Sequence, residues 1–105
     1  MSRIRGRTLT GVKSYLSAAH RCRDNGTIHG HTWEIIVWFN NQPRRDARIL
    51  KQQIEDVLSQ WDHGILPDEL AWAEDICLYI SMIEDVVAVE ISRPHEGLLA
   101  RWESR

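Results

Sequence analysis

Hydrophobic and polar residues alternate in the first part of the chain, with the period of half-buried β-strands. The alternation is loose over residues 7–20, and alternate positions up to His20 fall on one face of an extended segment. A second strand begins near His29 and continues through the apolar run that ends at Phe39. The polar stretch between them contains Asn25-Gly26, a strong turn signal, so the sequence predicts a β-hairpin.

Helical spacing replaces this alternation in the middle of the chain. Apolar residues line one side of the segment 47–61 and charged residues the other, and Asp46 stands where an N-cap is expected. A second amphipathic helix is predicted over 71–84. Two further strands are predicted at 86–92 and 98–102, because a β-branched run and a final apolar segment flank a turn.

The predicted order is therefore strand, strand, helix, helix, strand, strand. Such an order is typical of an α+β domain with an antiparallel sheet and two helices on one face. A length of 105 residues fits a single domain, 1–105, with one modest core. About four strands in an open sheet leave two unpaired edges, so we expect a homo-oligomer that closes through them.

Composition narrows the classes of partner. The chain has 13 basic and 15 acidic residues, and this balance favours neither nucleic acid nor an anionic membrane surface. Its longest uninterrupted apolar run is Ile35 to Phe39, too short to span a bilayer. Two cysteines, Cys22 and Cys77, are too few for a disulfide scaffold, and no signal peptide is expected. We therefore expect a cytoplasmic protein with a small-molecule or protein partner.

Three histidines are the first candidates for chemistry. In a strand, His29 and His31 point to the same side, and a hairpin would bring His20 to the same end. Three neutral imidazoles at about 2.0–2.1 Å from a common point form a zinc site whose fourth position is vacant, as in catalytic zinc. The alternative is that they are unrelated surface or turn residues.

Two further positions suggest acid–base or binding chemistry. The carboxylate of Asp62 stands beside His63, where it can fix the imidazole tautomer and raise its basicity, or the pair simply ends the first helix. Glu90 lies within an apolar strand and would accept two adjacent N–H donors of a ligand, or it faces solvent.

Together these residues resemble the 6-pyruvoyl-tetrahydropterin synthase and 6-carboxy-tetrahydropterin synthase family. The resemblance covers nearly the whole chain in the right order, and its most specific part is Ala-Ala-His followed by His-Gly-His. The matching positions are Leu16-Ser17-Ala18-Ala19-His20, His29-Gly30-His31-Thr32-Trp33, Asp46 with Leu50-Lys51, Asp62-His63 and Glu90.

The resemblance implies the tunnelling fold, in which trimers close the sheet into a barrel and two trimers form a homo-hexamer with active sites at subunit boundaries. It implies zinc held by His20, His29 and His31, a proton relay through Asp62 and His63, and a pterin ring anchored by Glu90. The implied enzyme is a zinc-dependent lyase acting on 7,8-dihydroneopterin triphosphate. The 6-carboxy reaction of the queuosine and deazapurine route is favoured, because short bacterial-type sequences of this kind more often belong there; the pyruvoyl reaction is the alternative.

The chain departs from the family pattern at its cysteine. Members carry a catalytic Cys four or six positions before His-Gly-His, where this chain has Asn25 and Arg23. Cys22 lies seven positions before it, and three roles stay open: a displaced thiolate base, a fourth zinc ligand that would close the site, or neither.

A second departure is at the start of the second helix. The family has Thr or Ser ahead of a Glu that contacts the pterin; here Trp72-Ala73 precedes Glu74, so Trp72 is a candidate to stack on a heterocycle. Two other classes fit part of the pattern. One is a zinc-binding member that has lost catalysis, and the other is a cupin, since His29-x-His31-x-x-Glu34 is close to that family's motif.

Overall fold

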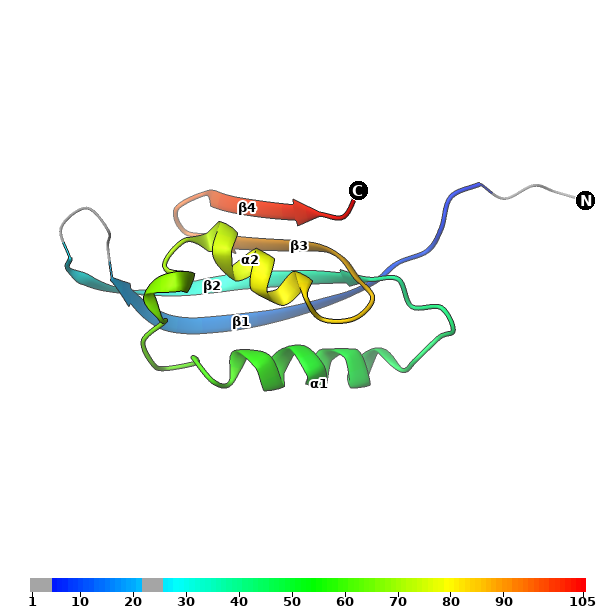
Figure 1. Cartoon of the computed structure of the whole chain (residues 1–105), viewed down its shortest axis with the longest axis horizontal. Helices are drawn as coiled ribbons and strands as arrows, with labels where there is room; N and C mark the ends of the chain where they lie inside the picture. Colours follow the sequence, from blue (N-terminus) through cyan, green and yellow to red (C-terminus); the bar gives the residue numbers. More distant parts are fainter. Residues whose placement is uncertain (1–4, 22–25) are drawn as a thin grey trace, which may run out of the picture.

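The computed structural model describes residues 5–21 and 26–105. Four strands form one antiparallel sheet in the order β1-β2-β3-β4, and both α-helices lie between β2 and β3 in the sequence (Figure 1). The elements are β1 Thr10–Arg21, β2 Ile28–Phe39, α1 Ala47–Leu58, the short 3-10 helix η1 Asp68–Leu70, α2 Ala73–Ser81, β3 Val86–Arg93 and β4 Leu98–Glu103. This order confirms the predicted α+β class and rules out the cupin alternative, which needs many strands and few helices.

One face of the sheet is buried by the helices. Leu16 is paired with Trp33 in the register of β1 and β2, and Ile35 with Ile91 in that of β2 and β3. All four side chains are buried, because residues directly opposite each other in a pleated sheet share a face. Helix α1 packs on β1, and α2 packs on β3 and β4. The core therefore lies between this face, which we call the helix side, and the two helices.

Each helix contributes one apolar stripe to this core. Leu50, Ile54 and Leu58 of α1 are buried, and Asp46 caps the helix by accepting a hydrogen bond from the backbone N–H of Arg48 at 2.9 Å. In α2, Cys77 is only 1% exposed, and its burial raises the pKa of the thiol to about 11. Cys77 is therefore an inert core residue.

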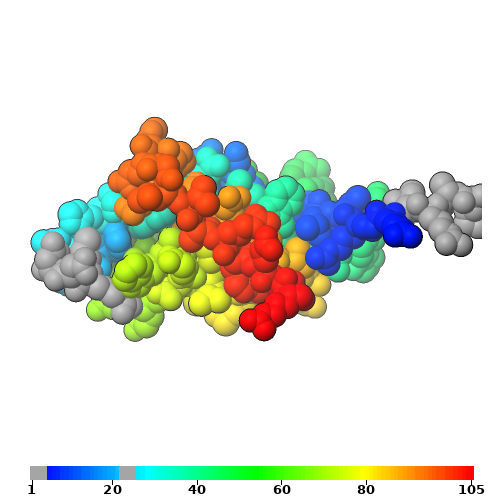
Figure 2. Space-filling model, turned by 90° about the horizontal axis from the view of Figure 1, so that it is seen from above, coloured from blue at the N-terminus to red at the C-terminus, as the bar shows by residue number. Residues whose placement is uncertain are grey.

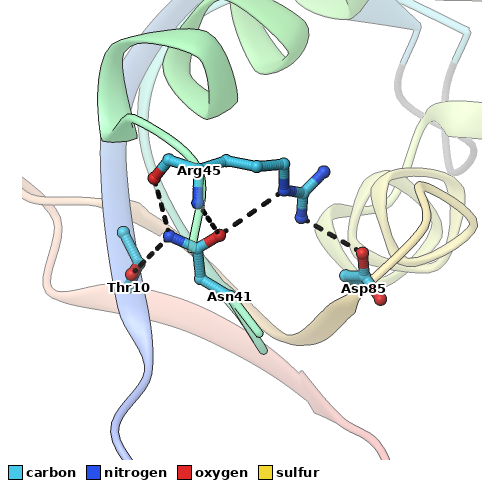
Figure 3. A network of polar contacts seen from close by, with 4 residues as sticks. All are labelled: Thr10, Asn41, Arg45 and Asp85. Carbon is cyan, nitrogen blue, oxygen red and sulfur yellow. Dashed lines mark hydrogen bonds and ion pairs between the residues drawn. The ribbon is translucent and has the colours of Figure 1, made fainter. Parts of the chain in front are cut away.

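A polar network fixes the end of the sheet where β1 begins (Figure 3). The buried Asn41 donates to Thr10 Oγ1 at 3.3 Å and to the Arg45 carbonyl at 2.9 Å, and accepts from the Arg45 backbone N–H at 2.9 Å. Arg45 reaches on to Asp85 at 3.1 Å. These contacts join the loop after β2 to both β1 and the turn before β3. The three histidines lie at the opposite end of the hairpin.

The two edge strands of the sheet differ in how far another segment pairs with them. Residues 63–66 pair with the outer side of β1, where Ala19 N–H donates to Gly64 O at 2.9 Å and Leu66 N–H donates to Ala19 O at 2.8 Å. No described segment pairs with the outer edge of β1 between Thr10 and Tyr15, or with the outer edge of β4. Within the same residues, no helix has the length and apolar character needed to cross a bilayer.

Candidate metal and substrate site

The hairpin brings the three candidate histidines to one end of the helix side. His20 is directly opposite His29, and His31 is opposite Ala18, so all three side chains project from the same face. The ring centroids of His20 and His31 are 4.9 Å apart, and those of His29 and His31 are 6.4 Å apart. Trp33 packs edge-on against both His20 and His31.

His20 is held in a single tautomer. Its Nδ1 lies 2.9 Å from the carbonyl oxygen of Ala71, and because a carbonyl only accepts, Nδ1 carries the proton. In the neutral ring the other nitrogen, Nε2, then bears a lone pair, and it is buried without a hydrogen-bond partner in the described chain. An imidazole whose outer N–H is fixed by a carbonyl, with its second nitrogen unused, is the usual state of a histidine metal ligand.

His31 lies under the guanidinium of Arg93. Nη1 of Arg93 is 3.2 Å from Nδ1 and 3.0 Å from Nε2 of the ring. An atom in the ring plane at both distances would overlap Cε1, so Nη1 lies over the ring face and leaves the in-plane lone pair unused. Desolvation, and next the charge of Arg93, lower the pKa of His31. Both effects favour the neutral ring, which is the form that binds metals.

Of the three histidines, His29 is the one whose ring nitrogen is already engaged in a hydrogen bond that metal binding would break. Its Nε2 is 2.8 Å from Thr27 Oγ1. As the side chains stand, no three His, Cys, Asp or Glu residues of the described chain are close enough together to enclose a metal ion. The donor set nevertheless fits zinc, since three imidazoles share one face and one of them has an orphaned buried nitrogen. Metal binding through Nε2 of His29 requires that the ring break its hydrogen bond with Thr27 Oγ1.

A pocket of about 540 Å³ opens beside His20 on the helix side, between the first turn of α2 and the adjoining ends of β3 and β4. Trp72 and Glu74 from the start of α2 form part of its wall, so the structure places both predicted ligand contacts next to His20. Trp72 is 53% exposed, a high value for an indole. The remaining lining residues are Arg21, Trp33, Ala71, Ala73, Ile91, Ser92, Arg93, Leu98, Leu99 and Ala100.

Glu90 lies away from this pocket. It is opposite Ile36 in β2 and Arg101 in β4, and its carboxylate is 3.7 Å from the Arg101 guanidinium. Val89 and Ile91 on either side are buried on the helix side, so strand alternation directs Glu90 to the other face of the sheet. Within one chain, Glu90 and the histidines are therefore on opposite faces.

Asp62 and His63 lie at the edge of β1, after the end of α1. Asp62 Oδ1 accepts from the backbone N–H of Ser17 at 2.9 Å and is 3.7 Å from His63 Nδ1. His63 has a φ of 61° and a largely exposed side chain, and it borders a shallow recess with Gly30 and His31. Neither Asp62 nor His63 is among the residues that line the pocket beside His20. Cys22 lies outside the described residues.

Sequence reasoning missed the roles of Arg93 and Ala71. Arg93 follows Ile91 by two positions in β3, so alternation alone assigns it to the helix side, where it meets His31. The Ala71 contact joins residues 51 positions apart through a backbone oxygen, for which no residue type gives a signal.

Comparison with known proteins identifies the family and supports the fold. The family described as 6-pyruvoyl tetrahydropterin synthase matches residues 10–102. The solved structure of Caenorhabditis elegans 6-pyruvoyl tetrahydropterin synthase has the same fold, with a TM-score of 0.69, 17% identity, and coverage of 97% of this chain and 100% of that chain. No curated protein matches the sequence. The match over nearly the whole length shows that the chain belongs to the 6-pyruvoyl tetrahydropterin synthase family, a family of lyases.

Proposed function

We propose that the chain is a zinc-dependent lyase that converts 7,8-dihydroneopterin triphosphate into 6-carboxy-5,6,7,8-tetrahydropterin with loss of acetaldehyde, in the queuosine and deazapurine route. The observation that carries this proposal is the orphaned Nε2 of His20, in a cluster of three histidines beside a pocket that accepts a bicyclic heterocycle. Formation of the 6-pyruvoyl product is the alternative within the same family.

His20, His29 and His31 are the proposed zinc ligands. When bound, zinc would supply a Lewis acid for the side-chain oxygens of the substrate, which makes the neighbouring protons easier to remove. In the neutral His20 ring, the carbonyl of Ala71 keeps the proton on Nδ1 and the lone pair on Nε2. Burial, and next the charge of Arg93, lower the pKa of His31. The chain's own contribution is therefore an oriented His20 and a His31 whose neutral form is favoured.

The heterocycle would occupy the pocket beside this cluster. Trp72 offers an exposed indole face for stacking, and Glu74 offers a carboxylate that accepts two adjacent N–H groups of a pterin. Trp72 would supply a contact in place of the hydroxyl that the family carries ahead of this Glu. The apolar part of the wall, Ile91, Leu98 and Ala100, would pack against the bound heterocycle.

Proton transfer is assigned to Asp62, His63 and Cys22, and the second pterin contact to Glu90. Because Asp62 and His63 do not line the pocket and Glu90 lies on the opposite face, we propose that Asp62, His63 and Glu90 serve the pocket of a neighbouring copy. The two open sheet edges support a homo-oligomer, a hexamer of two trimers, in which such sharing is possible. We assign the protein to the cytoplasm.

The test is to purify the protein with its native metal, measure zinc per chain, and follow products of dihydroneopterin triphosphate by mass. We expect about one zinc per chain and a 6-carboxy product from the wild type. His20→Ala should lose both, whereas His95→Ala, in the exposed turn after β3, should lose neither. A wild type without zinc would contradict the proposal.

The Cys22→Ala variant separates the remaining alternatives. Loss of turnover with zinc retained assigns Cys22 as the base, and loss of zinc assigns it as a ligand. The second candidate function is a zinc-binding protein without catalysis, which is favoured by Asn25 and Arg23 at the usual cysteine positions. Zinc in the wild type with no consumption of substrate would establish that candidate instead.

A further inference from the structure

The rings of His20 and His31 are held in different ways. The ring of His20 is fixed in its own plane, because Nδ1 lies 2.9 Å from the Ala71 carbonyl oxygen. In the described part of the chain, the polar contacts of both His31 nitrogens are with Arg93 Nη1, which lies over the ring face at 3.2 and 3.0 Å. A histidine that binds a metal usually has its orientation fixed by an in-plane acceptor. For His31, the guanidinium of Arg93 stands in place of that acceptor.

The orientation of the His31 ring depends on such a contact, because χ2, the torsion that turns a histidine ring, has a broad energy profile. The ring lies 5.5 Å from the ring of Trp33, with the two planes at 64°, and 4.9 Å from the ring of His20. Arg93 covers a face of the ring, and a planar guanidinium stacks on an aromatic face. Turning the ring about χ2 would tilt this face away from Nη1. The contact therefore favours one orientation of the ring.

The turn after β3 holds Arg93 in this position. Glu96 Oε2 lies 3.1 Å from Arg93 Nε, and the backbone N–H of Glu96 donates to the Arg93 carbonyl at 2.9 Å. Gly97, which has a φ of 68°, donates to the same carbonyl at 3.1 Å. In Figure 2 this turn, in orange, lies at the same end of the molecule as the beginning of β2, in cyan. Arg93 is thus restrained at its carbonyl and at Nε, and Nη1 is presented to His31.

The charge and the position of Arg93 have opposite effects on a metal ion at His31. A positive guanidinium beside the ring repels a dication, so charge by itself weakens metal binding. A ring that is already held loses less conformational entropy on binding, so position strengthens it. Glu96 lies 3.1 Å from Nε and offsets part of the positive charge, and we therefore expect position to dominate. Removal of the guanidinium would tighten metal binding if charge dominated and weaken it if position did.

We propose that Arg93 is a positioning residue, whose guanidinium holds the His31 ring with its in-plane nitrogens open to the metal ion. This inference rests on the proposed function for the metal, and it adds a role for a residue outside the ligand set. The restraint on the ring does not require metal, so it can be measured separately.

The test is the affinity of metal-free protein for Zn²⁺, measured by competition with a chromophoric chelator. Arg93→Lys keeps the charge and loses the planar group, whereas Arg93→Gln loses the charge together with the guanidinium. We expect both variants to bind Zn²⁺ about tenfold more weakly or worse, as for other outer-shell partners of metal ligands. An Arg93→Gln variant that binds Zn²⁺ as tightly as the wild type, or more tightly, would overturn the proposal.

Co²⁺ gives a spectroscopic readout of the same site, since its visible absorption falls when water replaces a histidine in a four-coordinate site. We expect weaker absorption in both Arg93 variants than in the wild type. Arg48→Gln is the matched control, because Arg48 is also paired with a carboxylate, Asp46 at 3.0 Å, but at the start of α1. It should keep the wild-type affinity and spectrum.

NMR relaxation of the His31 ring carbons in metal-free protein tests the restraint directly, and thermal melts of each variant check that the fold is retained. We expect larger ring motion in both Arg93 variants than in the wild type and Arg48→Gln. Ring motion that is unchanged in both Arg93 variants would also overturn the proposal. A wild type that binds no metal, but whose ring motion depends on Arg93, would reject the zinc site and uphold the restraint.

Discussion

At the scale of single residues, the tautomer of the neutral His20 ring follows from one backbone contact. The Ala71 carbonyl can only accept, so it fixes the proton on Nδ1 and leaves Nε2 as a buried lone pair. An unpaired buried polar nitrogen is costly unless something binds it. His31 is kept neutral by a different cause, burial together with the charge of Arg93. The tautomer of His20 and the neutral form of His31 thus have separate causes.

The lowered pKa of His31 predicts how the stability of the metal-free protein depends on pH. Below the ordinary histidine value of about 6.5 the unfolded chain takes up a proton at this position that the folded chain resists. The contribution of the neutral His31 ring to the free energy of unfolding should therefore be fully present above that pH. It should be lost as the pH falls toward the pKa of His31 in the folded chain. Urea titrations between neutral and mildly acidic pH measure this slope.

His31→Asn should flatten that slope, because it removes the group whose proton uptake differs between the two states. His95→Asn controls for the loss of one histidine from an exposed turn. If His31→Asn keeps the wild-type slope, the pH dependence comes from another group and the assignment to His31 is wrong.

Strand alternation explains which site residues could be predicted from the sequence. It placed His20, His29 and His31 on one face, because register and parity are local properties once a hairpin is recognised. The same rule, applied to β3, directs Glu90 and Arg93 to opposite faces. The position of α2 over the end of the sheet, which decides what lines the pocket, depends on packing between distant segments and has no local signal.

At the scale of elements, the helix limits differ from the predicted ones for a physical reason. The apolar period of the first helix was predicted to reach 61, but α1 ends at Leu58, where the Ser59 hydroxyl donates to the Asp56 carbonyl at 2.7 Å. Trp61 is still buried, and its ring packs edge-on against Tyr79 of α2 at 5.0 Å. A core position can be filled from a turn as well as from a helix. The apolar period of the sequence therefore extends beyond the end of α1.

Two isoleucines of α1 test how far this helix depends on its buried stripe. Ile54 is 0% exposed and Ile49 is 57% exposed, so the same substitution removes core packing in one case and surface area in the other. Ile54→Ala should lower the free energy of unfolding by about 2–5 kcal/mol. Ile49→Ala should change it by less than about 0.5 kcal/mol. Chemical denaturation of both variants gives the comparison, and equal losses would contradict the packing described for α1.

At the scale of the whole molecule, the sheet has a covered and an uncovered part along the same edge strand. Residues 63–66 pair with β1 around Ala19, and beyond Tyr15 toward Thr10 the described chain supplies no partner. The order of strands in the sequence predicts two open edges. It does not predict that one edge is partly covered, because this cover depends on where the segment after α1 returns to the sheet. An uncovered stretch beside a covered one defines where a second copy would pair.

Backbone donors at odd-numbered positions of β1 point outward, as the contacts of Ser17 and Ala19 show. Lys13 shares this parity, so Lys13→Pro should remove an outward N–H without breaking a bond to β2. We expect a folded protein of smaller mass than the wild-type oligomer, measured by light scattering with circular dichroism. Lys13→Ala is the control, since it also loses the exposed ion pair with Glu34 at 3.3 Å but keeps the N–H. Ser14→Pro, whose donor faces β2, should instead unfold the hairpin. A Lys13→Pro variant with the wild-type mass would show that this edge takes no part in assembly.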